Sequence, residues 1–226
     1  LYYGNSNATA GSDTNLDTLD NIFTKKLETD ATLLAEYHMD EGIGVSTVDT
    51  SGNNRTATFV GNPVWQVNDG GQWDGINKQF NFGSHLQFAG NWLTLSGTGF
   101  PTGGNSRTIT FWVRATVAQA NWTILFLTGN RVSSQAWLVA VDPQGNIALS
   151  NWGQSVVSSG VNICDGNWHF IRVQSILNNY TIFIDEVNRG TGVMTTNTAL
   201  SATAYIGGHP DENDFTGFMD GVRYYN

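Results

Sequence analysis

The sequence is poor in cysteine, in basic residues and in long apolar runs. A single cysteine, Cys164, cannot form a disulfide within the chain, and its apolar neighbours Val161 and Ile163 favour a small core residue over a reactive thiol. Only 10 Lys and Arg stand against 19 Asp and Glu, a net charge of -9, which argues against nucleic-acid binding because phosphate contacts need clustered cations. No run of about twenty apolar residues occurs, so no segment is predicted to insert into a membrane.

What the sequence does contain indicates one large all-β domain. Gly is abundant at 26 residues and charged residues make up only 13% of the 226, a composition that favours strands joined by turns over exposed helices. Aromatic residues, at 12%, supply bulk for a core. A chain of this length can bury such a core without splitting into two sandwiches.

From Leu33 onward the hydrophobic pattern is that of successive strands. Leu33, Ala35, Tyr37 and Met39 alternate with more polar residues, so Asp40 is expected to point away from the core. Without crossover helices, the strands predict an antiparallel two-sheet sandwich. The other predicted strands are Thr56–Val60, Gln79–Phe82, His85–Phe88, Thr108–Arg114, Thr123–Thr128, Ala136–Val141, Asn146–Ser150, Trp168–Gln174, Tyr180–Asp185, Ala202–Gly207 and Phe215–Tyr225.

The first thirty residues differ from the rest. Leu1–Asn5 predicts a strand with no visible partner, and Leu16, Leu19, Phe23 and Leu27 fall at the spacing of a short amphipathic helix. We therefore expect residues 1–30 to be the tail of a preceding domain plus a linker, and residues 31–226 to be the sandwich. The first strand can pair with another chain, which makes self-association a possible property.

Several ordered motifs resemble one family. They are Tyr37-His38-Met39-Asp40-Glu41-Gly42, Asp49-Thr50-Ser51-Gly52-Asn53-Asn54, Thr108–Arg114, Asp165–Val173, and Ile206-Gly207-Gly208 leading into Asp220–Tyr225. The set is similar to laminin-G-like, concanavalin A-like jelly-roll domains, and Leu1–Asn5 resembles the last strand of an uncharacterised β domain that precedes such sandwiches in prokaryotic surface proteins. Gly221 departs from the pattern, since the family usually carries an acidic residue there.

A structural calcium site is the sharpest chemical prediction. Asp220 lies within an apolar strand, where a carboxylate needs a cation, backbone donors or a metal. The resemblance implies that the first and last strands meet and that calcium is often held at this junction, with Asp40, Asp49, Asn53 and Asp220 as oxygen ligands. The alternative is an Asx-turn at Asp49, with Asp220 accepting hydrogen bonds from the backbone or from an arginine.

Catalysis is predicted to be absent. A glycoside hydrolase needs two carboxylates that project together, which on one strand requires a spacing of two or four residues. Asp185 and Glu186 are adjacent and fall at an expected hairpin turn, and no E-x-D-x-E pattern occurs. His169 lies in a strand whose counterpart in the family is structural. A carboxylate pair formed across two strands is left open.

Ligand binding is predicted at tryptophans near turns. Trp112 and Trp168 lie in predicted core strands, whereas Trp65, Trp73, Trp122 and Trp152 lie near turns, where rings can stack on sugars. The acidic loop His209–Asp214 lies near strand ends and predicts either a ligand contact or a solvated tip. We select Trp122, Trp152, His209 and Asp211 as candidate ligand-binding residues.

Together these features predict a non-catalytic recognition or adhesion module of an extracellular or cell-surface protein. Its partner is expected to be a glycan or a surface protein, and calcium is expected to stabilise the fold. Two alternatives remain, a structural or assembly subunit of a surface structure and a polysaccharide-cleaving enzyme.

Overall fold

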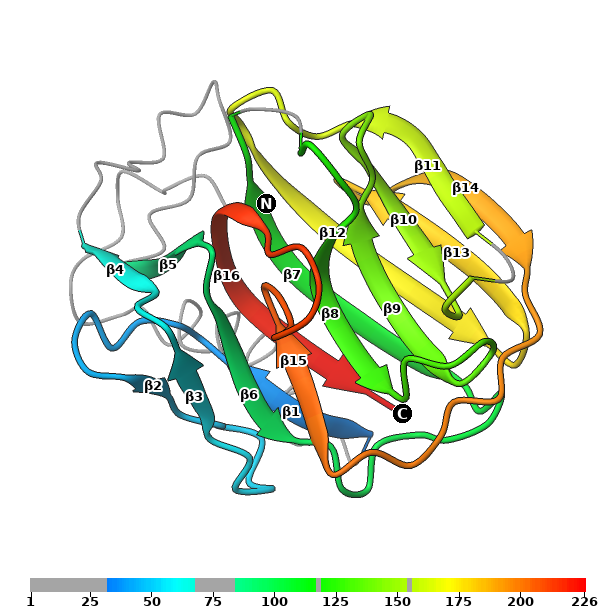
Figure 1. Ribbon diagram of the computed structural model, residues 1–226, viewed down its shortest axis with the longest axis horizontal. Helices are drawn as coiled ribbons and strands as arrows, with labels where there is room; N and C mark the ends of the chain where they lie inside the picture. The colour runs from blue at the N-terminus through cyan, green and yellow to red at the C-terminus, as the bar shows by residue number, and fades with distance from the viewer. Residues whose placement is uncertain (1–31, 68–83, 117–118, 154–155) are drawn as a thin grey trace, which may run out of the picture.

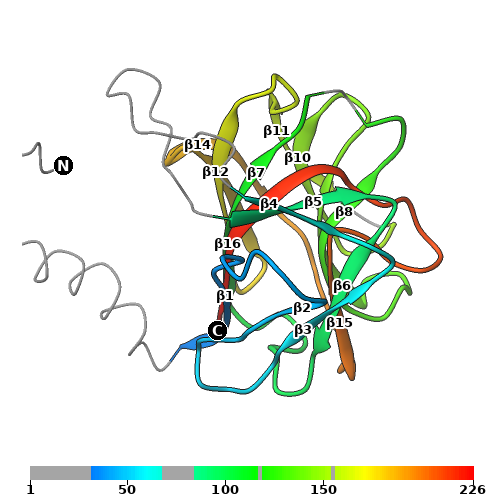
Figure 2. The same cartoon turned by 90° about the vertical axis from the view of Figure 1, so that its left-hand side faces the viewer.

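The protein is a sandwich of two eight-stranded antiparallel sheets. The computed structural model describes residues 32–67, 84–116, 119–153 and 156–226. In Figure 1 the sheet containing β8, β9 and β10 lies in front of the sheet containing β7, β12 and β16. Figure 2 shows the two layers from the side. The predicted fold class, an all-β jelly-roll sandwich, is confirmed.

The strands of each sheet follow a spatial order far from their order in the chain. The first sheet runs β14 (Val187–Val193), β13 (Asn179–Ile184), β12 (Trp168–Ile176), β7 (Arg107–Arg114), β16 (Thr216–Tyr225), β5 (Ser84–Ala89) and β4 (Val64–Val67), with β1 (Leu33–Tyr37) also paired to β16. The second sheet runs β11 (Val156–Asn162), β10 (Asn146–Ser150), β9 (Ala136–Val141), β8 (Thr123–Gly129), β15 (Thr203–Ile206), β6 (Trp92–Ser96), β3 (Ala57–Val60) and β2 (Ser46–Thr47).

The last strand, β16, closes the first sheet. One side of β16 pairs with β7, and its other side pairs first with β5 and then with β1. The first and last strands of the sandwich are therefore neighbours, as predicted. The ladder to β7 shifts register between Asp220 and Arg223, and Gly221 within this bulge has φ +56°. A bulge with a glycine in the left-handed region bends the strand and leaves an extra residue outside the regular pairing.

The main core lies between the sheets and follows the period-two alternation of the strands. In β1 the predicted inward residues Leu33, Ala35 and Tyr37 are buried, as is Met39 just beyond the strand, while Asp40 is exposed. Trp137 is the largest fully buried side chain.

Two of the tryptophans lie on the outer face of the first sheet. Trp112 and Trp168 lie in β7 and β12 as predicted, but both are half-buried and fall outside the core between the sheets. The ring of Trp112 packs 5.2 Å from the ring of Phe170, and both side chains alternate with inward-facing core residues. Both strands carry bulky residues on their outer faces as well as on their inner faces, so aromatic content alone does not reveal which face is buried.

The predicted strands agree well with the observed ones where the alternation is regular. Ala136–Val141 and Asn146–Ser150 match without any shift. The prediction missed β2, β4, β6, β11 and β14, which are short or weakly apolar. The predicted domain tail and helix of residues 1–30, the strand Gln79–Phe82 and Trp73 lie outside the described residues, and the boundary near residue 31 stays a prediction.

Candidate functional site

A cavity of about 320 Å³ opens on the outer face of the second sheet. Its floor comes from outward-facing residues of β8, β9, β10 and β11, and its sides come from the segments next to these strands. The lining residues are Trp122, Ile124, Leu138, Ala140, Ser150, Trp152, Gly153, Val156 and Glu212.

The cavity is hollow because several outward-facing side chains at its centre are small. Along each strand they alternate with residues that face the main core. Ala140 pairs across the ladder with Ala148, and Ser150 pairs with Leu138, so little bulk rises from the middle of the sheet. Leu138 and Ala140 belong to a second apolar cluster, separate from the main core, against which Trp152 packs. Tall indole rings beside a low apolar floor form a concave surface of the kind that binds small ligands.

Trp152 is held in an unusual backbone conformation. Its φ is +71°, a value that bulky residues rarely adopt. The backbone N–H of Trp152 donates to Ser150 Oγ over 3.1 Å, and the guanidinium carbon of Arg131 lies 5.8 Å from its ring centroid. A strained residue kept in place by its neighbours is a common feature of functional sites.

The acidic loop His209–Asp214 supplies one wall of the cavity through Glu212. Arg131 binds two carboxylates of this loop, with Nη1 to Glu212 Oε1 at 2.7 Å and Nη2 to Asp211 Oδ2 at 2.6 Å. The loop also reaches the start of β8, where the N–H of Ile124 donates to the carbonyl of Asn213. Glu212 and Trp122 thus line the same cavity.

His209 shapes the same loop rather than lining the cavity. Its ring lies 4.5 Å from that of Tyr205, its backbone N–H donates to Asp214, and its Nδ1 accepts the N–H of Asp211 over 3.2 Å. Burial, together with the nearby Arg131 charge, lowers the pKa of His209. A neutral ring is the form that accepts this hydrogen bond.

The four predicted ligand-binding residues therefore gather around one region. Trp122 and Trp152 line the cavity, and His209 and Asp211 belong to the loop that forms its wall. Sequence reasoning missed Arg131 and Glu212. Glu212 carried a signal, since it lies beside Asp211 in the acidic loop, whereas nothing near Arg131 in the chain indicates its partners.

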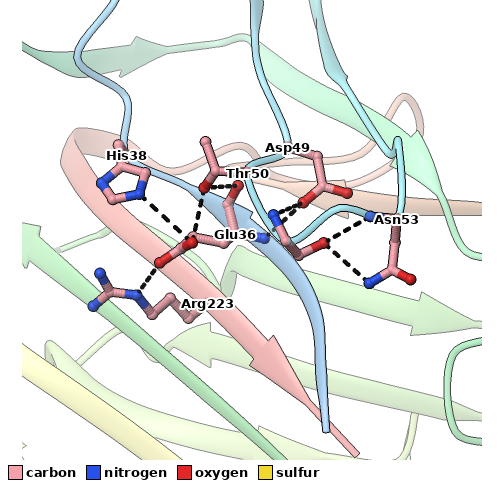
Figure 3. A network of polar contacts seen from close by, with 7 residues as sticks. Glu36, His38, Asp49, Thr50, Asn53 and Arg223 are labelled. Carbon is pink, nitrogen blue, oxygen red and sulfur yellow. Dashed lines mark hydrogen bonds and ion pairs between the residues drawn. The ribbon is translucent and has the colours of Figure 1, made fainter. Parts of the chain in front are cut away.

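A second polar cluster surrounds the pairing of β1 with β16 (Figure 3). Glu36 is 1% exposed, and its carboxylate accepts hydrogen bonds from Arg223 Nε at 2.5 Å and from Thr50 Oγ1 at 2.8 Å, with His38 Nε2 at 3.6 Å. Burial raises the pKa of Glu36, but the hydrogen bonds from His38, Arg223 and Thr50 outweigh it and bring that pKa to about 2. The hydrogen bond to Glu36 raises the pKa of His38.

Asp49 and Asn53 serve the backbone beside this cluster. Asp49 Oδ1 accepts the N–H groups of Glu36 and Ser51, each over 3.0 Å, and Oδ2 accepts that of Arg55 over 2.8 Å. The bond to Ser51 is the Asx-turn that the sequence offered as the alternative. The side-chain amide of Asn53 donates to the carbonyls of Leu33 and Leu34. The side chains of Asp49 and Asn53 thus hold the loop between β2 and β3 against β1.

Asp40 and Asp220 are the two predicted calcium ligands that lie close enough to interact. Asp220 is 2% exposed, and its Oδ1 accepts the N–H of Gly221 over 2.9 Å. Burial, with the nearby Asp40 charge, raises the pKa of Asp220 to about 9. Asp40 is exposed as a residue, but partial desolvation of its carboxyl group raises its pKa. Two neighbouring carboxyl groups cannot both ionise cheaply without a cation between them.

The four predicted ligands thus fall into two groups. Among the described residues, no three or more His, Cys, Asp or Glu side chains are arranged to hold a metal ion. The pair Asp40 and Asp220 suits a cation by its chemistry, whereas Asp49 already accepts three backbone donors. The calcium site stays a prediction, and the mutual repulsion of Asp40 and Asp220 favours these two carboxylates among the four predicted ligands.

His169 lies between two carboxylates at the start of β12. Its Nδ1 is 2.9 Å from Asp185 Oδ2 and its Nε2 is 3.1 Å from Asp165 Oδ1. Asp185 and Glu186 occupy the turn between β13 and β14, as predicted, and Asp185 Oδ1 also accepts the backbone N–H of Phe170. These contacts link the loop before β12 to the turn between β13 and β14.

Solved structures share the fold of this chain at low sequence identity. Domain 4 of AbnA, a GH43 extracellular arabinanase from Geobacillus stearothermophilus, in complex with arabinotriose, has a TM-score of 0.64 at 17% identity, covering 86% of this chain and 92% of that domain. The binding domain of botulinum neurotoxin DC in complex with SialylT has a TM-score of 0.61 at 14% identity, covering 86% of this chain and 47% of that one. The binding domain of Paraclostridial Mosquitocidal Protein 1 has a TM-score of 0.57 at 14% identity, over 86% and 48%. The chain thus spans about half the length of these two toxin domains.

Other comparisons complete the assignment. No curated protein matches the sequence. Within the residues that the structure describes, no helix has the length and hydropathy needed to cross a membrane. The family model described as the concanavalin A-like lectin/glucanases superfamily matches residues 87–226, which is more than half of the sequence. The spatial order of the strands, with β16 closing the first sheet against β1, is that of a jelly roll. This chain belongs to the concanavalin A-like lectin/glucanases superfamily.

Proposed function

We propose that this chain is a non-catalytic carbohydrate-binding module of an extracellular or cell-surface protein, and that its sugar site is the cavity between Trp122 and Trp152. The observation that carries the proposal is that these two tryptophans line one cavity together with the apolar residues Ile124, Leu138 and Ala140. A volume of about 320 Å³ suits one or two sugar rings.

The chemistry of the cavity supports a sugar as ligand. Indole rings offer flat apolar faces to the C–H side of a sugar, and Trp122 is 39% exposed. Glu212 and Ser150 add polar groups that can exchange hydrogen bonds with hydroxyl groups. Recognition of a sugar needs both features, since its rings are apolar on the faces and polar at the rim.

The structural neighbours support the same class of ligand. Domain 4 of the arabinanase was solved with arabinotriose and a botulinum neurotoxin binding domain with SialylT, while another copy of the neurotoxin domain was solved with rat synaptotagmin II. The last complex keeps a protein partner as the second candidate. The extracellular setting of the arabinanase supports an extracellular location for this chain.

The proposal is tested with a glycan array followed by titration calorimetry on the parent and three variants. Trp122→Ala and Trp152→Ala should each weaken binding at least about tenfold, because each removes a stacking surface worth more than about 1 kcal/mol. Trp112→Ala is the matched control, since this half-buried tryptophan lies in the first sheet. Its binding should equal that of the parent.

Other outcomes separate the alternatives. Loss of binding in Trp112→Ala alone would move the site to the first sheet. An empty glycan array would favour a protein partner, and self-association of the purified chain would favour an assembly subunit. Release of reducing ends from a polysaccharide would contradict a non-catalytic module.

Calcium is the second part of the proposal. Asp40 and Asp220 would hold the ion, and the ion would neutralise two carboxylates at the junction of the first and last strands. The support is the strongly buried Asp220 carboxyl with its raised pKa beside Asp40. In this proposal calcium stabilises the fold and takes no part in sugar binding.

A further inference from the structure

The charged residue that lines the cavity is acidic. Of the described residues that line it, none is basic, and Glu212 is acidic. The nearest guanidinium, that of Arg131, is engaged by Glu212 at 2.7 Å and by Asp211 at 2.6 Å. The cluster of one guanidinium and two carboxylates has a net charge of minus one. It therefore exerts little attraction on a further anion.

Arg131 also has a packing role that keeps it in this position. Its guanidinium lies 5.8 Å from the ring centroid of Trp152, so leaving the carboxylates for an anionic ligand would disturb the contact with the cavity wall. The side chain is 31% exposed, Glu212 is 30% exposed, and the two bonds are short. Paired charges with this geometry are not readily released to a competitor.

A carboxylate at the wall of a sugar site favours one class of sugar. The Oε1 atom of Glu212 is bound to Arg131, and a carboxylate has further acceptor positions that hydroxyl groups can fill. A sugar carboxylate placed there would meet like charge in a partly desolvated cavity, on a chain whose net charge is -9.

We propose that the cavity selects neutral sugars over sugars that bear a carboxylate, and that Glu212 is the residue that sets this selectivity. The inference rests on the proposed sugar site, and it names the class of sugar that the site takes. It also assigns Arg131 a positioning role, since Arg131 holds both Glu212 and Trp152.

The test uses pairs of sugars that differ by one acidic unit. Xylotriose is compared with its glucuronosyl form, and N-acetyllactosamine with its sialylated form, with arabinotriose as a further neutral probe. For each pair, calorimetry gives the ratio of the dissociation constants of the acidic and neutral sugars. We expect the parent to bind the neutral member at least about tenfold more tightly, a difference of about 1.4 kcal/mol.

Three variants assign the effect to Glu212. Glu212→Gln removes the wall charge and leaves Arg131 with one partner, so the ratio should fall at least about fivefold. Arg131→Gln leaves both carboxylates unneutralised, so the ratio should rise even where overall affinity drops. Glu186→Gln is the control, because it removes the same charge from another arginine-paired carboxylate, bound to Arg172 at 2.7 Å on the first sheet. Its ratio should match that of the parent.

The outcomes separate this inference from the proposed function. If the parent binds both members of a pair equally, the selectivity is wrong and the sugar site stands. If it binds no sugar of either kind, the proposed function fails and this inference fails with it. A ratio unchanged in Glu212→Gln, or changed equally in Glu186→Gln, would show that Glu212 does not set the selectivity. Melting curves of each variant establish that it is folded.

Discussion

Glu36 shows how one side chain joins distant parts of this chain. It is 1% exposed, yet it contacts Arg223 in the last strand and Thr50 in the loop after β2. The alternation of β1 places Glu36 on the outer face, where the partners cover it. Removing one member of such a group leaves a buried charge without compensation, which costs more than the group contributes as a whole.

The first prediction concerns the acid stability of Glu36. Its folded pKa of about 2 lies below the ordinary value of 4.5, so its contribution is fully present above pH 4.5 and is lost as the pH falls towards 2. At about 1.4 kcal/mol per pH unit, the loss approaches about 3 kcal/mol. Glu36→Gln should therefore unfold more easily at pH 7 and show a flatter stability profile between pH 4.5 and 2, measured by urea denaturation.

A surface pair supplies the control for that experiment. Glu186 is 60% exposed and binds Arg172, so Glu186→Gln should change stability by less than about 1 kcal/mol at pH 7. If Glu36→Gln kept the pH profile of the parent, the low pKa of Glu36 and its role in joining β1 to β16 would both be wrong.

At the scale of the elements, the edges of the two sheets meet at β11 and β14. Glycines in β14 make this approach possible, since a Cβ at Gly190 would lie 2.6 Å from the carbonyl oxygen of Ser158 and one at Gly192 would lie 2.7 Å from Val157. Each of the edge strands β11 and β14 therefore covers the other, which protects both from pairing with other chains.

The second prediction tests this closure of the sandwich. Gly190→Ala should destabilise the protein by about 1 to 3 kcal/mol, because a backbone atom cannot move aside as a flexible side chain can. Thr191→Ala, at the exposed neighbouring position, should change stability by less than about 0.5 kcal/mol. Thermal unfolding followed by circular dichroism measures both. Equal melting temperatures for the two variants would contradict the close approach of the edges.

At the scale of the whole molecule, the sandwich is closed by its first and last strands. β1 and β16 are separated by almost the whole described sequence, yet they pair directly, and Asp40 and Asp220 lie close enough at this junction to interact. Contacts between such distant segments are costly to form in entropy, so anything that fastens this junction stabilises the entire fold.

The third prediction asks whether calcium fastens the junction. Millimolar calcium should raise the melting temperature of the parent by about 5 to 10 °C relative to EGTA, if the ion is present at about a hundred times its dissociation constant. Asp220→Asn should lose this response. In EGTA the variant should be at least as stable as the parent at pH 7, because the folded parent holds a proton on Asp220 up to about pH 9 that the unfolded chain has released.

Asp49→Asn provides the contrast for calcium. An amide cannot accept all three backbone N–H groups that Asp49 now accepts, so this variant should be less stable in both buffers and should keep the response to calcium. A parent that melts at one temperature with and without calcium would contradict the proposal. Loss of the response in Asp49→Asn would return Asp49 to the set of ligands.

Much of the fold could be predicted because local patterns decide it. The strands with regular alternation, the turn at Asp185 and Glu186, and the burial of Asp220 all follow from neighbouring residues. The strands that were missed, such as β11 and β14, carry polar residues and glycines because they pack at the sheet edges. The pattern of a strand weakens where only part of it is covered.

Only part of the candidate site could be predicted from the sequence. Trp122, Trp152, His209 and Asp211 could be selected because each lies near a turn or in the acidic loop. The pairing of Arg131 with Asp211 and Glu212 could not be predicted, since Arg131 lies some eighty positions before them and no local pattern in either segment indicates the other. The separation of Asp49 from Asp40 and Asp220 was equally hidden, because two acidic residues close in sequence can serve different neighbours.

Composition and period-two alternation were enough to predict an all-β sandwich with an acidic surface, because both depend on residues close in the chain. Tertiary structure alone decided that Trp122 and Trp152 stand over one cavity and that Arg131 is neutralised beside it. It also decided that Asp220 is close enough to Asp40 for their charges to interact. These relations depend on strand order and register, which are set by packing between segments far apart in the chain.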